Sequence, residues 1–164
     1  VIALCAVFYW HHWKKVLILV TAFTLGHSIT LALASLHIIS FQPEIIEFLI
    51  PVTIFVTALS NVLRKKSDFS WLNYGYAAFF GLIHGLGLSN YLQSLLGKEV
   101  NILDKLLAFN LGLEIGQIVI VALFFLVSWI VTSFIRFRQT YWSSLVSFFV
   151  LILSVYLIYN AKFW

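Results

Sequence analysis

Two histidines and a glutamate lie near the middle of apolar segments that are long enough to span a membrane. His27 stands in FTLGHSITLALA, His84 in FFGLIHGLGLS and Glu114 in FNLGLEIGQ. An ionised side chain at the centre of a bilayer costs about 2.5–3.5 kcal/mol on translocon scales, so such residues usually mark a functional interior. Imidazole and carboxylate groups that converge in a dry helix bundle can bind a transition metal. The sequence therefore predicts an intramembrane metal site formed by these three residues.

Polar neighbours of these residues are candidates for a supporting layer around the ion. Asn110, Glu114 and Gln117 follow the i, i+4, i+7 spacing of one helix face. Thr24 and Ser28 flank the first histidine closely enough to hydrogen-bond its ring or a water beside it. Groups of this kind orient metal ligands and tune them. The alternative for the two amides is a hydrogen bond between helices, without a role at a metal.

The remaining histidines are less suited to a buried site. His37 lies near the end of its apolar segment, so we expect it at the membrane interface, with an access ligand as the alternative. His11 and His12 lie among Trp and Lys residues, as is usual at an interface. A single intramembrane histidine can equally be a hydrogen-bonding group between helices, and that interpretation stays open for His27 and His84 taken singly.

Two glycine pairs accompany the polar residues. Gly81 with Gly85, and Gly112 with Gly116, have the small-xxx-small spacing that lets helices approach closely in a membrane. We expect both pairs to bring helices together around a narrow polar interior.

The composition places the chain among integral membrane proteins. Of its 164 residues, 62% are hydrophobic and 10% are charged, and the mean hydropathy is +1.02. A soluble domain would be about 25% charged. The formal charge of +4 comes from short loops without a basic stripe, so nucleic-acid binding is not expected. Cys5 is the only cysteine, which excludes an intrachain disulfide and a thiolate metal cage.

Apolar runs between short polar loops predict an all-α fold, a polytopic membrane helix bundle that forms a single domain over residues 1–164. A span needs about 20 residues. The run that opens at Val1 is shorter, so we expect it to be the later part of a helix that begins before the numbering. The six expected spans are about 1–10, 16–39, 44–63, 71–96, 103–135 and 142–162.

Positive charges predict which loops face the cytoplasm. Loops 11–15, 64–70 and 136–140 carry seven Lys and Arg residues, whereas the alternate loops and their flanks carry two. Cytoplasmic loops are enriched in these residues. We therefore expect the three loops to be cytoplasmic. The two histidine-bearing spans then run in the same direction, and the glutamate-bearing span runs in the opposite direction.

Taken together, FTLGHSITLALA, GLIHGLGLS and FNLGLEIGQ resemble the HupE/UreJ family of hydrogenase and urease accessory membrane proteins, in particular its second, shorter branch. The resemblance implies six or seven helices and a role in binding or carrying nickel or a similar metal. By motif, it assigns metal handling to His27, to His84, and to Glu114 with Gln117. Family members usually carry a Gly-x-Asp-His motif at the start of the first helix. The chain begins after that point, so one further Asp and His are expected outside the numbering.

The leading hypothesis is a permease or accessory carrier for a divalent transition metal, with Ni²⁺ favoured and Zn²⁺, Cu²⁺ or Fe²⁺ as alternatives. Membrane lipids, the ion and metalloenzyme maturation proteins are the expected partners, and the oligomeric state is left open. The chief alternative is an intramembrane metalloenzyme, because two His and one carboxylate also form catalytic iron and zinc sites. A third is a metal sensor or chaperone anchor that acts through His11, His12 and the basic loops. In each case metal binding should weaken as the pH falls, since the ligands must be deprotonated.

Overall fold

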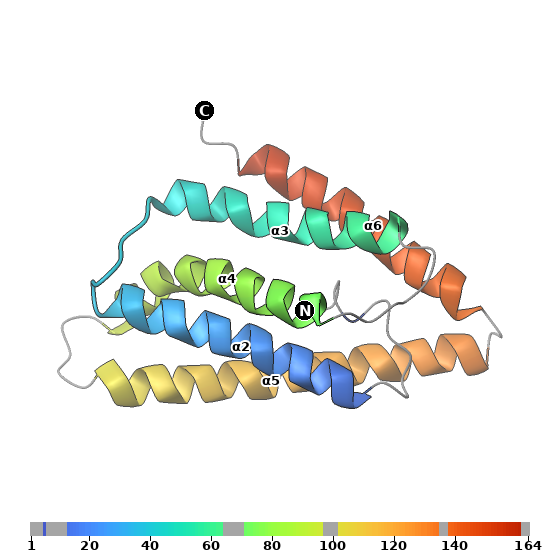
Figure 1. The fold of residues 1–164 in the computed structure, drawn as a ribbon, viewed down its shortest axis with the longest axis horizontal. Helices are drawn as coiled ribbons and strands as arrows, with labels where there is room; N and C mark the ends of the chain where they lie inside the picture. Colours follow the sequence, from blue (N-terminus) through green and yellow to red (C-terminus); the bar gives the residue numbers. More distant parts are fainter. Residues whose placement is uncertain (1–4, 6–12, 64–70, 97–101, 135–137, 162–164) are drawn as a thin grey trace.

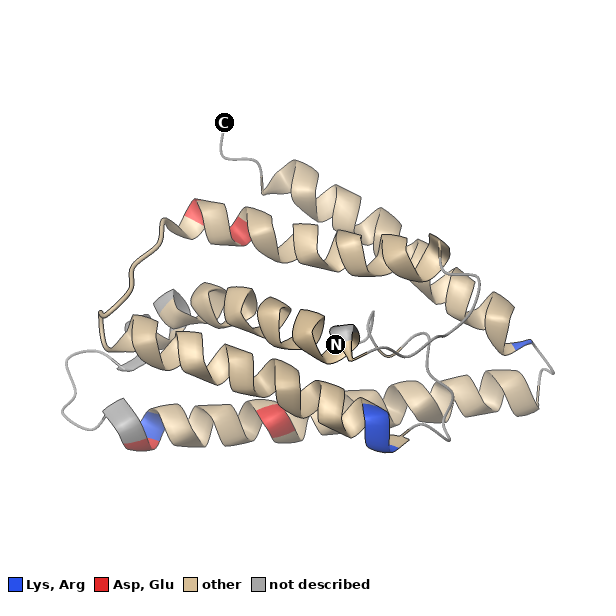
Figure 2. Cartoon of the chain, viewed as in Figure 1, with Lys and Arg blue, Asp and Glu red and all other residues tan. Residues whose placement is uncertain are grey.

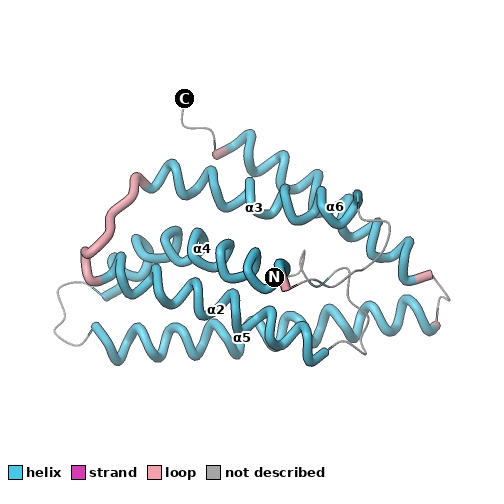
Figure 3. Tube along the Cα trace, viewed as in Figure 1, coloured by secondary structure: helices cyan, strands magenta, loops and turns pink. Residues whose placement is uncertain are grey.

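The protein is an all-helical bundle over the residues that its computed structural model describes, namely 5, 13–63, 71–96, 102–134 and 138–161. Figure 1 and Figure 3 show long helices connected by short loops, with no strand in these ranges. The helices are α2 (Trp13–Ser35), α3 (Pro43–Leu63), α4 (Leu72–Leu96), α5 (Ile102–Ser133) and α6 (Gln139–Asn160). They confirm the predicted all-α class.

Five of the predicted spans correspond to these helices. The largest difference is in α2, which covers Trp13–Ser35 where a span over 16–39 was predicted. Helix α5 has 32 residues, in agreement with a segment longer than a single crossing needs. The predicted first span, 1–10, lies outside the described residues except for Cys5, which is buried. The loop 64–70, residues 11–12 of the first loop and residues 136–137 of the last loop also lie outside them.

Four of the described helices are long and apolar enough to cross a membrane, and they identify an integral membrane protein. They are α2, α3, α6 and the Asp104–Ser133 part of α5. Large apolar side chains such as Ile115, Val119 and Leu123 are exposed along α5. Figure 2 shows that most described charged residues lie toward helix ends. This distribution suits a bundle surrounded by lipid, in which charges avoid the hydrocarbon region.

Helices α2 and α4 make the most extensive contact of the described helix pairs, and they run in the same direction (Figure 1). Phe23 packs with Ala77 in the first half of both helices, and Leu31 packs with Leu92 in the second half of both. The hydroxyl of Thr30 also donates a hydrogen bond of 2.8 Å to the carbonyl oxygen of α4 at position 82. The parallel arrangement agrees with the direction predicted for the two histidine-bearing spans.

Helix α5 runs in the opposite direction to α2. Val20 packs with Val121 in the later part of α5, whereas Leu31 packs with Leu106 near its beginning. Helix α3 packs on both α4 and α6. The bundle therefore has α2 and α4 at its centre, with α5 on one side of α2 and α3 on one side of α4.

Glycines allow the backbones of α2 and α4 to touch. A Cβ atom at Gly26, Gly81 or Gly85 would overlap a backbone oxygen of the facing helix. The predicted role of the first glycine pair in helix packing is thus confirmed. Gly112 and Gly116 differ, because a Cβ at either would meet nothing within 4 Å in the described part of the chain. The expectation that this second pair brings helices together is not met there.

Helix α2 ends in a Schellman cap, which explains why it ends at Ser35, before the predicted residue 39. His37 has a φ of 56°, in the left-handed region. Its N–H donates to the carbonyl oxygen of Ala34 at 3.0 Å, and the N–H of Ile38 donates to that of Leu33 at 3.0 Å. Histidine adopts this conformation more readily than most residues other than glycine. The cap turns the chain toward α3 and leaves His37 exposed.

Candidate metal centre

The imidazole of His27 is enclosed within the bundle without hydrogen bonds. The residue is 1% exposed, and neither ring nitrogen has a partner among the described residues. Its ring stacks on that of Phe23, one helical turn earlier, with centroids 6.3 Å apart and an interplanar angle of 17°. A buried polar group without a partner costs about 1–3 kcal/mol. Such an arrangement suits a site in which the ring nitrogens coordinate an ion or form hydrogen bonds with a water.

His84 lies on α4 at the same level as His27. The glycines on either side of it, Gly81 and Gly85, abut the backbone of His27. The ring of His84 meets the ring of Phe23 edge to face, with centroids 5.3 Å apart and an angle of 62°. On its other side, its Nε2 atom is 3.3 Å from the hydroxyl oxygen of Thr53 in α3. The two imidazoles therefore share one aromatic neighbour.

Polar residues of α5 meet α2 beside this centre. Thr24 donates a hydrogen bond of 3.3 Å to the Oε1 atom of Gln117, and Ser28 donates one of 2.7 Å to the carbonyl oxygen of Thr24. The Oδ1 atom of Asn110 is buried without a partner in the described part of the chain. Glu114, between the two amides on the same helix face, is half-buried. The predicted polar face of α5 thus meets α2 at Gln117, which accepts the hydrogen bond from Thr24.

The antiparallel pairing sets the level of the α5 residues relative to the histidines. Contacts at both ends of the stretch 24–31 in α2 place it opposite the stretch 106–117 in α5. The first stretch contains His27, and the second contains Asn110 and Glu114. His27, Asn110 and Glu114 therefore lie at similar heights along the bundle.

A complete set of three ligands is not assembled within the described residues. There, no group of three or more His, Cys, Asp or Glu side chains is close enough to hold a metal ion. The structure brings His27 and His84 to the same aromatic ring, and it places Glu114 on the neighbouring helix. The assignment of these three residues as joint metal ligands stays a prediction.

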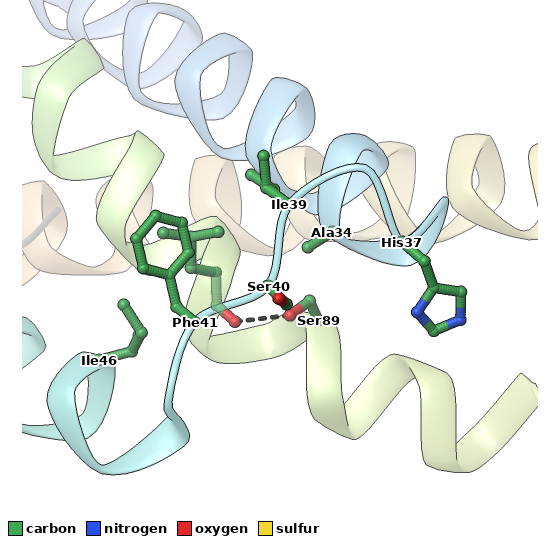
Figure 4. Close-up of a pocket in the computed structure, with 8 residues that line it drawn as sticks. Ala34, His37, Ile39, Ser40, Phe41, Ile46 and Ser89 are labelled. Carbon is green, nitrogen blue, oxygen red and sulfur yellow. Dashed lines mark hydrogen bonds between the residues drawn. The ribbon is translucent and has the colours of Figure 1, made fainter.

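A separate pocket of about 90 Å³ lies where α2 ends, and Figure 4 shows it. Ser89 in this pocket donates a hydrogen bond of 2.7 Å to the carbonyl oxygen of Leu86. In Figure 4 the side chain of His37 points away from the other labelled residues, and its role as an access ligand stays a prediction. The lining consists of Ala34, His37, Ile39, Ser40, Phe41, Ile46, Leu86 and Ser89.

Two residues of the centre were not predicted from the sequence. Phe23 precedes His27 by four residues, a spacing that places both on one helix face, and this signal would have identified it. Thr53 gives a weaker signal: Thr53, Thr57 and Ser60 follow the i, i+4, i+7 spacing of one polar face of α3, but this spacing does not show which helix that face meets. Only the packing of α3 against α4 identifies Thr53 as a neighbour of His84.

Comparison with known proteins gives one family. The family described as HupE / UreJ protein matches residues 1–163, a range that includes every helix of the candidate centre. None of the curated proteins and none of the solved structures that were compared matches the chain.

Proposed function

The chain belongs to the HupE/UreJ family, and from this membership and its buried imidazoles we propose that it binds a divalent transition metal inside the membrane as cargo. Ni²⁺ is the favoured ion, with Zn²⁺, Cu²⁺ and Fe²⁺ as alternatives. The observation that carries the proposal is His27, which is 1% exposed with two ring nitrogens that lack a partner in the described residues. His84, against the same Phe23 ring, supplies the second imidazole.

The types of donor atom favour this class of ion. Neutral imidazole nitrogen suits borderline divalent metals, whereas Mg²⁺ and Ca²⁺ prefer sites built from oxygen ligands. Glu114 would offset part of the charge of the ion, which is costly to bury alone. Thr24, Ser28 and the amides Asn110 and Gln117 would orient ligands or hold waters around it.

A carrier role fits the arrangement of the donors better than a storage role. An ion that must be passed on needs donors that hold it without a rigid, closed shell. His27 and His84 contact the same ring, Phe23, from two different helices, so they offer nitrogen donors that are not locked together by a common backbone. In this proposal the protein serves metalloenzyme maturation from a bacterial inner membrane, with the loops 11–15, 64–70 and 136–140 in the cytoplasm.

The proposal predicts the Ni²⁺ affinity of variants of the centre. Ala at His84 or Glu114 should lower the affinity of the detergent-purified protein by more than the roughly 10- to 100-fold that loss of a supporting residue typically costs. Equilibrium dialysis followed by elemental analysis measures this affinity. The matched control is His37→Asn, because His37 is exposed outside the centre and asparagine tolerates its left-handed backbone.

Reconstituted vesicles separate a carrier from a protein that only binds the ion. Vesicles that contain the parent protein and an enclosed Ni²⁺-sensitive dye should report Ni²⁺ entry, and His84→Ala vesicles should not. The proposal is wrong if the parent binds no transition metal, or if both alanine variants keep the parent affinity. Binding without entry would leave a metal-binding accessory protein and exclude the carrier role.

A further inference from the structure

Thr53 on α3 makes two contacts that determine where its hydroxyl hydrogen lies. Its Oγ1 atom is 2.7 Å from the carbonyl oxygen of Ile50 and 3.3 Å from the Nε2 atom of His84. The residue is 6% exposed. A carbonyl oxygen has no hydrogen to donate, so the single hydroxyl hydrogen of Thr53 occupies the short contact with Ile50. The hydroxyl oxygen is then left to accept a hydrogen bond from the Nε2–H of His84.

This bond selects one of the two neutral forms of the imidazole. A neutral histidine carries one N–H, and a proton on Nε2 leaves the lone pair on Nδ1. We propose that Thr53 is a positioning residue, which holds His84 in the Nε2–H tautomer and so makes Nδ1 the nitrogen that binds the ion. The metal-binding half of this inference rests on the proposed function. Histidines that bind metals almost always donate their other N–H to a protein acceptor, which fixes the ring orientation.

The position of the Thr53 hydroxyl is defined by the helix that carries it. A threonine side chain has few χ1 rotamers in a helix, and the bond to Ile50 selects among them. The Ile50 side chain occupies the space beside Gly87, which keeps α3 close to α4 one turn from His84. The acceptor for His84 is therefore held by contacts within α3 and by the packing of α3 on α4.

The other side of the His84 ring is also restrained. Phe23 of α2 meets it edge to face at 5.3 Å. The imidazole thus lies between a hydrogen-bond acceptor from α3 and an aromatic ring from α2. With Nε2 engaged by Thr53, Nδ1 is the remaining nitrogen available to an ion in this centre.

The test compares variants at Thr53 with a matched variant one turn away. Thr53→Val removes the hydroxyl at nearly constant volume, Thr53→Ala is a second variant without it, and Thr53→Ser keeps it. Thr57→Val is the control, because Thr57 is also a buried threonine of α3 and its hydroxyl bonds the backbone of α3. Nitrogen NMR of metal-free protein labelled with ¹⁵N-histidine reports the tautomer, and loss of one signal pair in His84→Gln assigns it.

The parent, Thr53→Ser and Thr57→Val should show His84 protonated at Nε2. Thr53→Val and Thr53→Ala should show a mixture of tautomers and bind Ni²⁺ about 10- to 100-fold more weakly in equilibrium dialysis. Unchanged His84 signals in both variants without the hydroxyl overturn the inference, whatever the metal does. A changed tautomer with full Ni²⁺ affinity overturns its metal-binding half. A parent protein that binds no Ni²⁺ overturns the proposed function instead, while the NMR comparison still decides the role of Thr53 in the tautomer.

Discussion

Replacement of His27 by leucine is expected to stabilise the metal-free protein and to abolish its stabilisation by Ni²⁺. The imidazole of His27 is 1% exposed, and neither ring nitrogen has a partner among the described residues. An unpartnered buried polar group costs about 1–3 kcal/mol, whereas a hydrophobic side chain of similar volume costs less than about 1.5 kcal/mol in misfit. Leucine removes the cost of the unpartnered imidazole and adds the smaller cost of imperfect packing. We therefore expect the free energy of unfolding to rise by about 1 kcal/mol.

Chemical unfolding of the detergent-solubilised protein, with and without Ni²⁺, measures both effects. A ligand that binds only the folded state stabilises it by about 2.7 kcal/mol at a concentration 100 times its dissociation constant. The parent should show such a gain, and His27→Leu should show none. Thr57→Val is the contrast, because it removes a buried polar group whose hydrogen bond of 2.8 Å is intact, and it should not stabilise the protein. If His27→Leu is less stable than the parent and still responds to Ni²⁺, His27 is a structural residue.

A methyl group at Gly81 is expected to separate α2 from α4. A Cβ atom there would overlap the carbonyl oxygen of Phe23 and lie 3.0 Å from the backbone nitrogen of His27. These are backbone atoms of a regular helix, which cannot move aside as the end of a side chain can. Overpacking usually costs about 1–3 kcal/mol, and we expect Gly81→Ala to lie at the upper end of that range. The variant should also lose Ni²⁺ affinity, because the clash displaces His27.

Gly112→Ala provides the matched control in the same kind of structure. Gly112 is inside α5, and a Cβ there would meet nothing within 4 Å in the described part of the chain. Alanine has a higher helix propensity than glycine by about 1 kcal/mol, so this variant should equal or exceed the parent in stability. The comparison uses the same unfolding and dialysis measurements. Equal stability of Gly81→Ala and Gly112→Ala would show that α2 and α4 do not pack as closely as the structure has them.

Much of the candidate centre was predictable because polar side chains are costly inside a membrane, so the few that occur in apolar segments stand out in the sequence. Thr24 was selected because it flanks His27, and Gln117 because it shares a helix face with Glu114; the structure joins the two by a hydrogen bond between α2 and α5. The relative directions of the helices followed from the order of the predicted spans, since the number of crossings between two segments determines whether they run parallel. The end of α2 was less predictable, because the left-handed cap at His37 has no glycine to mark it.

The sequence by itself determined the membrane class, the five described helices and their relative directions, because these depend on local hydropathy and on the order of the apolar segments. The tertiary structure alone decided which residues are neighbours. It placed Phe23 between two imidazoles and Thr53 against His84, and it made Gly81 a contact point while Gly112 meets nothing in the described residues. Helices that are apolar on all sides carry no amphipathic period to show which face meets a partner. In lipid that choice depends on the close packing of small residues and on hydrogen bonds between helices, which only the folded arrangement reveals.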